Sequence, residues 1–285
     1  MWYAIIGIIV LLMVGVSLCL AAAAAMFSPD KVPASKTQSG REVCFKSGKK
    51  KLKGWFWNED GKTGLVVVSH GMGVNVDYYM PEILAFTDKG YKVFAYDYSG
   101  YGESEGRFLG FETAVKDLKC AIDFAYDDSL PLVLFGHSMG AYASAAVGQI
   151  TDKKIAATIL AAPFTSPKDA VKELTSSNKK IGKLMAFAVN VTRGVMFGKH
   201  GNLEAAKGIL AANAPTLILQ GANDKEVTVS GCALYSKRNE LPPFVKSVLI
   251  SDEGSDGHMT IIRRKGEKCV NARTAIEVES FLHSL

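Results

Sequence analysis

After residue 41, short apolar runs alternate along the chain with longer stretches of mixed apolar and polar residues. Short, continuous apolar runs are typical of strands buried on both faces of a parallel sheet, and we expect strands at 65–69, 91–96, 131–135, 155–161, 216–220 and 247–250. Longer, mixed stretches separate these runs, and we expect helices at 77–89, 111–126, 228–238 and 271–285. A hairpin is expected first, over 42–57. The alternation predicts an α/β fold, with a mostly parallel central sheet and helices on both faces.

The alternation breaks over residues 163–214, which contain no convincing strand. Such a stretch is too long for a bare connection in a compact domain. Apolar residues give it one side and lysines and arginines give it another, so we expect a small helical cap that covers the site and binds an acyl chain. An ordinary helical excursion is the alternative.

The N-terminus carries a second pattern, an apolar run without any charged residue from Trp2 to Phe27. A helix of that length reaches about 39 Å, and a hydrocarbon core is about 30 Å thick. We therefore expect a transmembrane anchor over 1–27. A cleaved signal peptide is the alternative, because Ala21–Ala25 offers small residues for cleavage, but the basic start and the short apolar stretch of such peptides are missing.

Basic residues follow the N-terminal run and none precedes it; the first are Lys31, Lys36 and Arg41. The positive-inside tendency then places the catalytic domain on the cytoplasmic side, whereas cleavage would give a secreted protein. Residues 28–40, with two prolines and several polar residues, are expected to be a linker, and 41–285 the catalytic domain. Deleting residues 1 to 40 should therefore remove little packing.

Composition limits which partners and cofactors the protein is expected to bind. A chain of 285 residues with 48% apolar and 21% charged residues can bury one large core, and its net charge of +5 is spread without a strongly basic stripe, so no nucleic-acid partner is expected. The 5 cysteines are odd in number and form no C-x-x-C pair, which argues against disulfides and a zinc site. The glycine-rich turn at 97–104 lacks the lysine of a phosphate-binding loop. We expect no metal and no cofactor.

The chemistry centres on Gly136-His137-Ser138-Met139-Gly140, a G-x-S-x-G sequence that ends the strand expected at 131–135. In a nucleophile elbow, a buried strand ends in a tight, strained turn that presents the serine hydroxyl, and a helix starts directly behind it. The small residues after Gly140 suit that helix. The alternative, a serine on a glycine-flanked surface turn, does not explain the strand before it or the helix after it.

The chain from residue 41 onward resembles the α/β-hydrolase superfamily, in particular its branch of serine aminopeptidase-like, monoacylglycerol-lipase-like and cinnamoyl-esterase-like proteins. The resemblance rests on motifs in the order of that branch: His70-Gly71-Met72-Gly73, Asp97-Tyr98-Ser99-Gly100-Tyr101-Gly102-Glu103-Ser104, the elbow, Gly221-Ala222-Asn223-Asp224 and Asp256-Gly257-His258. It implies an α/β-hydrolase fold and serine hydrolase chemistry.

The resemblance also implies roles for individual residues. Ser138 is expected to be the nucleophile, His258 its general base and later acid, and Asp224 the group that orients the imidazole. The backbone N–H groups of Met72 and Met139 are expected to form the oxyanion hole. Asp252 and Asp256 are the alternatives for the acid, but they lie close to His258 in sequence.

Two classes of function stay open at this point. The first is a membrane-anchored serine hydrolase that cleaves small-molecule carboxylic esters or thioesters through an acyl-enzyme, with a serine aminopeptidase-like peptidase as its nearer alternative. The second is a non-catalytic binding protein on a hydrolase scaffold. A binding role gives no reason to keep Ser138, Asp224 and His258 together, which disfavours this class. The motifs are shared by esterases, thioesterases, lipases and peptidases, so they do not select the substrate or an oligomeric state.

Overall fold

The structure is a computed structural model that describes residues 2–27, 32–37, 39–175, 179–263 and 269–285. Within these residues one central sheet has eight strands in the order β1-β2-β4-β3-β5-β6-β7-β8. The strands are β1 (Arg41–Ser47), β2 (Lys50–Trp57), β3 (Leu65–Ser69), β4 (Lys92–Tyr96), β5 (Leu132–His137), β6 (Ile155–Ala161), β7 (Thr216–Gly221) and β8 (Val245–Ile250). All neighbours from β4 to β8 pair in parallel, whereas β1 with β2 and β2 with β4 pair antiparallel.

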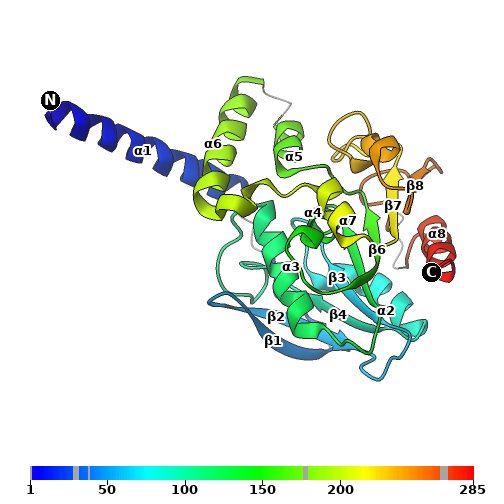
Figure 1. Ribbon diagram of the computed structural model, residues 1–285. Helices are drawn as coiled ribbons and strands as arrows, with labels where there is room; N and C mark the ends of the chain where they lie inside the picture. The colour runs from blue at the N-terminus through cyan, green and yellow to red at the C-terminus, as the bar shows by residue number, and fades with distance from the viewer. Residues whose placement is uncertain (1, 28–31, 38, 176–178, 264–268) are drawn as a thin grey trace.

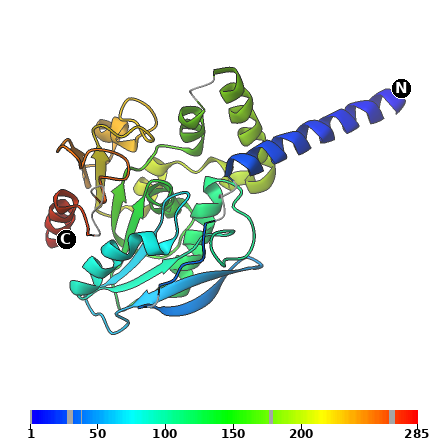
Figure 2. The same ribbon diagram turned by 180° about the vertical axis from the view of Figure 1, so that it is seen from behind.

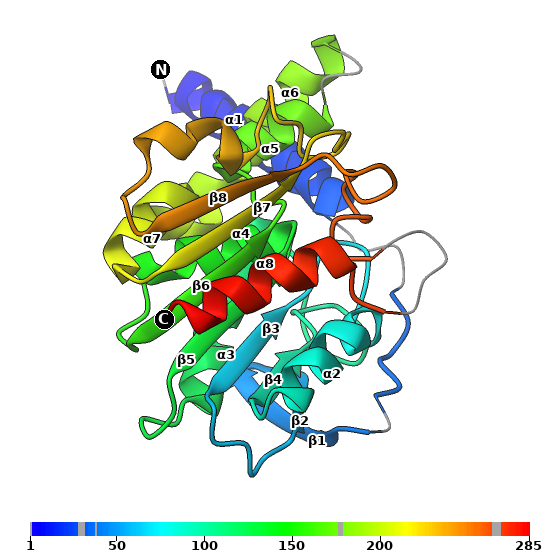
Figure 3. The ribbon, with the colours of Figure 1, turned by 90° about the vertical axis from the view of Figure 1, so that its right-hand side faces the viewer.

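Helices cover both faces of this sheet, as Figure 3 shows with α8 and α2 in front of the strands and α3, α4 and α7 behind them. The α-helices are α1 (Trp2–Phe27), α2 (Met80–Asp88), α3 (Phe111–Ala125), α4 (Met139–Ala146), α5 (Pro167–Leu174), α6 (Lys179–Phe197), α7 (Ala205–Ala212) and α8 (Ala272–His283). Short 3₁₀ turns are η1 (Val76–Tyr79), η2 (Val147–Gln149), η3 (Gly198–Asn202) and η4 (Leu234–Glu240). The predicted α/β-hydrolase fold is confirmed.

The apolar runs follow from burial on two sides of the sheet. In β3, Leu65 and Val67 pack into the core that contains α3, α4 and α7, whereas Val66 and Val68 pack into the core that contains α2 and α8. Successive side chains of a strand point to opposite faces, so a strand between two layers of helices needs apolar residues at every position. β5 is buried along its whole length in the same way, and the elbow lies at its end.

The 163–214 region is helical in its described part, but its helices differ in how they sit on the domain. The middle of α7 packs closely against the α4 backbone, since a Cβ on Gly208 would lie 2.1 Å from the carbonyl oxygen of Ala145. By contrast, α6 stands away from the sheet and lies beside α1 (Figure 1). The buried guanidinium of Arg193 pairs with Glu112 on α3 and joins α6 to the domain.

The prediction of an α-helix over 228–238 is wrong. The described chain forms a loop there and then only the 3₁₀ turn η4. The loop begins with Thr228, Ser230 and Gly231, which favour turns over helix interiors, and Pro242 follows shortly after η4. The Thr228 N–H is also bonded to the carboxylate of Glu173 on α5, at 2.8 Å.

The structure does not support the transmembrane anchor predicted over 1–27. Several side chains of α1, including Leu20 and those of 22–24, lie outside the described residues, so the described apolar stretch is shorter than the run in the sequence. Taken over the described residues, no helix is both long and apolar enough to cross a membrane. The predictions of a membrane partner and of a cytoplasmic side for the catalytic domain lose their support with it.

The N-terminal segment contacts the domain where it is described. Figure 2 shows that α1 meets the rest of the protein at the C-terminal end of the helix and extends away from it. At that end Phe27 is buried and packs edge-to-face on Phe111, with ring centroids 5.1 Å apart. Within the predicted linker 28–40, the Ser35 hydroxyl donates to Oδ2 of the buried Asp97 at 2.9 Å. The expectation that deleting residues 1 to 40 removes little packing is therefore wrong, because the deletion removes both contacts.

Candidate active site

The sharp turn expected around Ser138 lies between β5 and α4. Ser138 has φ 54° and ψ −118°, a conformation that costs a non-glycine residue about 1–3 kcal/mol and that recurs at functional sites. A Cβ on Gly136 would lie 2.3 Å from the Gly140 carbonyl oxygen, and a Cβ on Gly140 would lie 2.0 Å from that of Ser69. Only glycine fits at these two positions, because the turn folds the start of α4 tightly against β5 and β3.

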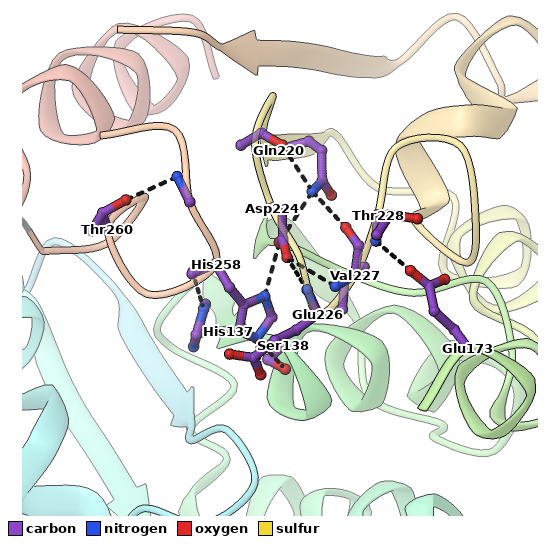
Figure 4. A network of polar contacts seen from close by, with 12 residues as sticks. His137, Ser138, Glu173, Gln220, Asp224, Glu226, Val227, Thr228, His258 and Thr260 are labelled. Carbon is purple, nitrogen blue, oxygen red and sulfur yellow. Dashed lines mark hydrogen bonds and ion pairs between the residues drawn. The ribbon is translucent and has the colours of Figure 1, made fainter. Parts of the chain in front are cut away.

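Three of the predicted site residues form one hydrogen-bonded chain. His258 Nε2 lies 2.9 Å from Ser138 Oγ, and His258 Nδ1 lies 2.8 Å from Asp224 Oδ2. Figure 4 shows the imidazole pointing between the two partners. Ser138 follows β5, Asp224 follows β7 and His258 lies on the loop after β8, so the carboxyl ends of three parallel strands bring the chain together.

Asp224 is 3% exposed, and its second oxygen is also occupied. Its Oδ1 accepts the N–H groups of Glu226 at 2.9 Å and Val227 at 2.8 Å. Burial by itself raises the pKa of Asp224, but the hydrogen bond from His258 and the two backbone N–H groups outweigh burial and leave the pKa below its ordinary value. The carboxylate is thereby kept charged beside the imidazole.

The alternative acids contact other groups. The Asp256 carboxylate accepts a hydrogen bond from the side-chain amide of Asn223 at 2.5 Å, and Asp252 lies 3.7 Å from Arg273 in an exposed ion pair. Of these carboxylates, Asp224 is the one that the structure brings to His258.

The predicted oxyanion residues lie on two neighbouring loops. Met139 is the first residue of α4, and Met72 lies on the loop that follows β3. Ser69 and Gly136 are register partners in the parallel pair β3 and β5, so the two loops leave the sheet side by side. His70 on the first loop is buried, its Nδ1–H donates to the Gly71 carbonyl oxygen at 2.7 Å, and burial lowers its pKa to about 4.

A buried hydrogen-bond chain that the sequence did not indicate joins these loops. His137 Nε2 lies 3.0 Å from the His258 carbonyl oxygen, so Nε2 carries the proton and Nδ1 is the acceptor. Tyr79 Oη lies 2.8 Å from that Nδ1 and donates to it, and the same oxygen accepts the Gly71 N–H at 2.9 Å. Burial lowers the pKa of His137 to about 3, with the neighbouring His258 adding to the effect, so the neutral tautomer persists. The oxyanion loop, the elbow and the loop of His258 are thereby connected.

Replacing Tyr79 by phenylalanine should therefore disturb both folding and catalysis. The variant leaves His137 Nδ1 and the Gly71 N–H without partners, which typically costs about 1–3 kcal/mol per buried group. We expect kcat to fall about 10- to 100-fold, with KM little changed, because the loops that position the base and the oxyanion donors lose the hydroxyl that connects them by hydrogen bonds. Steady-state kinetics and a thermal melt measure both effects.

The neighbouring residue provides a matched control for this test. Tyr78→Phe removes a hydroxyl one position away and keeps the aromatic ring that packs on Arg263. Equal kinetics for Tyr79→Phe, Tyr78→Phe and the unmodified protein would contradict a positioning role for this chain.

No metal cluster accompanies the site in the described part of the chain, since no group of three or more His, Cys, Asp or Glu side chains there is arranged to hold an ion. Among the residues that the structure describes, no disulfide joins Cys19, Cys44, Cys120 and Cys232 to one another.

A parallel sheet with an elbow serine, an imidazole and a buried carboxylate at its carboxyl edge defines the α/β hydrolases. The family model described as serine aminopeptidase, S33 matches residues 60–207. The chain belongs to this family, and it is a serine hydrolase of the esterase and lipase class.

Several known proteins are similar to the chain. A monoacylglycerol lipase of Mycolicibacterium smegmatis is 27% identical over 218 residues, which cover 64% of this chain and 78% of the lipase. The monoglyceride lipase of Mus musculus is 32% identical over 149 residues, or 49% of this chain and 48% of the relative. Among solved structures, an esterase of Pyrococcus furiosus superposes with a TM-score of 0.66 at 19% identity and covers 90% of this chain and 96% of its own, which shows the shared fold.

Proposed function

We propose that the protein hydrolyses carboxylic esters of monoacylglycerol type, through an acyl-enzyme on Ser138. The observation that carries the proposal is the hydrogen-bonded chain from Ser138 Oγ through His258 to Asp224. The similarity to monoacylglycerol and monoglyceride lipases supports the substrate class.

In the proposed first step, Ser138 Oγ attacks the ester carbonyl carbon while His258 Nε2 accepts the hydroxyl proton. The carbonyl oxygen becomes negative, and the N–H groups of Met72 and Met139 stabilise it. The C–O bond to the alcohol then breaks, and Nε2 returns the proton to the leaving oxygen. Asp224 holds Nδ1–H toward itself and stabilises the charged imidazolium.

In the second step, water attacks the acyl-enzyme. His258 takes a proton from the water, the same N–H groups stabilise the second oxyanion, and the bond between the acyl carbon and Ser138 Oγ breaks. Ser138 recovers its proton from His258 and the free acid leaves. The cycle uses only side chains and backbone groups of this chain and returns each of them to its starting state.

A panel of substrates tests this function. We expect turnover of p-nitrophenyl esters and of monoacylglycerols, and much lower turnover of aminoacyl anilides, because the relatives are lipases of monoglycerides. Esters of graded chain length would show which acyl group the enzyme prefers. Cleavage of the anilides without cleavage of any ester would contradict the proposal and identify a peptidase, and preferential cleavage of acyl thioesters would identify a thioesterase.

A further inference from the structure

The loop that follows Asp224 is fixed from two sides. Asp224 Oδ1 accepts the backbone N–H groups of Glu226 and Val227, so the proposed catalytic acid itself sets the start of the loop. Further along, the carboxylate of Glu173 on α5 accepts the N–H groups of Thr228 and Cys232. Figure 4 shows Glu173 on the far side of the loop from His258. The backbone position of Glu226 is therefore defined relative to the imidazole.

The Glu226 carboxylate lies next to the nitrogen that handles the proton. Its Oε2 is 3.6 Å from His258 Nε2, the same nitrogen that lies 2.9 Å from Ser138 Oγ. The side chain is 63% exposed and lines an open cleft of about 610 Å³ together with Lys172 and Lys225. A water-accessible carboxylate thus lies beside the nitrogen that transfers the proton.

Protonation of the leaving group places the alcohol beside this carboxylate. The leaving oxygen must come within about 3 Å of Nε2 to receive its proton. The carbon atoms attached to that oxygen then lie within a few ångströms of Glu226 Oε2, which can only accept hydrogen bonds. A plain alkyl group there displaces water from the charge without replacing its hydrogen bonds, whereas a hydroxyl on the adjacent carbon replaces one.

We propose that Glu226 is a specificity-determining residue that binds a hydroxyl group of the leaving alcohol and thereby selects esters of polyols such as glycerol. The proposal rests on the ester hydrolysis proposed above. A neutral hydroxyl fits better than a cation, because Lys172 and Lys225 line the same cleft and Glu173 is already engaged by two backbone N–H groups. Glu226 acts on the substrate without taking part in the bond-breaking steps.

The test compares two esters with the same acyl group and three-carbon leaving groups. Monobutyrylglycerol carries the hydroxyl groups, and propyl butyrate lacks them. We expect the full chain to favour the glycerol ester in kcat/KM, and this preference to fall about tenfold in Glu226→Leu, which is the usual effect of one hydrogen bond to a partly exposed charge. Glu226→Gln keeps an acceptor oxygen and should retain part of the preference.

The neighbouring lysine is the matched control. Lys225→Leu changes the charge of the same cleft by one unit, and we expect its preference for the glycerol ester to equal that of the unmodified protein. An undiminished preference in Glu226→Leu would overturn the proposal, and so would an equal loss in Lys225→Leu, because the preference would then not depend on the Glu226 carboxylate in particular.

Butyrylcholine separates hydroxyl recognition from attraction of a cation, since its leaving group is positively charged and has no hydrogen-bond donor. Preference for butyrylcholine that disappears in Glu226→Gln would overturn the hydroxyl assignment. Failure of the proposed ester hydrolysis has a different signature, because neither butyrate ester would then be cleaved by any variant or by the unmodified protein.

Discussion

Replacing Ser138 by alanine is expected to lower kcat for ester hydrolysis by about 10⁴-fold or more, since members of such a triad act as a unit. The reason is the geometry at the elbow, where Ser138 Oγ is the hydroxyl within hydrogen-bond distance of His258 Nε2. Alanine takes away the attacking atom and leaves the oxyanion loops unchanged. Any residual rate would come from substrate binding and oxyanion stabilisation.

Covalent labelling measures the same prediction directly. A fluorophosphonate should label the unmodified protein at Ser138 and fail to label Ser138→Ala. A thermal melt should show that the variant is folded, because alanine occupies the same strained backbone conformation as serine. Near-normal hydrolysis by Ser138→Ala, or labelling at a different serine, would refute the assignment of the nucleophile.

Replacing Asp224 by asparagine is expected to lower kcat by about 10⁴-fold, the size of effect seen when the orienting acid of such a triad becomes an amide. The carboxylate accepts Nδ1–H of His258 at 2.8 Å and so leaves Nε2 free to accept the serine proton. An asparagine that turns its NH₂ toward Nδ1 favours the other tautomer, in which Nε2 carries the proton. Steady-state rates at saturating substrate measure the loss.

The two alternative acids provide the controls for this variant. Asp252→Asn and Asp256→Asn change carboxylates that contact Arg273 and Asn223, and their rates should remain near that of the unmodified protein. Loss of activity in either of them, with normal activity in Asp224→Asn, would transfer the role of the acid to the loop before His258.

Acid stability gives a second readout for Asp224. Because the folded protein holds the pKa of Asp224 below its ordinary value of about 3.9, its ionised form contributes stability that is fully present above that pH. This contribution is lost as the pH falls through the lower, folded pKa. Between pH 5 and pH 2 the unmodified protein should therefore lose more stability than Asp224→Asn, measured by denaturant unfolding.

The parts of the fold that the sequence predicted are those in which local pattern and tertiary burial agree. The run 65–69 is apolar at every position because its strand lies between two layers of helices, and burial on both faces leaves no other choice. The elbow is also predictable from the sequence, because the contacts that a Cβ would make at Gly136 and Gly140 exclude every residue except glycine. The site residues that follow separate strands were then predicted by their order along the chain.

The remaining features depend on partners distant in sequence. Tyr79 bridges Gly71 and His137 only when η1, of which it is the last residue, packs against the loops after β3 and β5. No local pattern marks its hydroxyl as a bridging group. The stretch 228–238 was predicted to be helical, but the Glu173 carboxylate on another element binds two N–H groups at its start, where the residues also favour turns. Glu226 was an ordinary charged loop residue until the structure placed it 3.6 Å from His258.

The attachment of α5 to the loop after Asp224 sets a boundary for protein engineering. One way to engineer such an enzyme is to exchange its cap for that of a relative, and by the break in the sequence pattern residues 163–214 are the unit to exchange. The Glu173 carboxylate, together with the Thr165 N–H that donates to the Cys232 carbonyl oxygen, makes the first part of that region a support for the catalytic loop. A graft that begins after Leu174 would keep this support. A graft that begins at 163 would replace the support of the catalytic loop together with the cap.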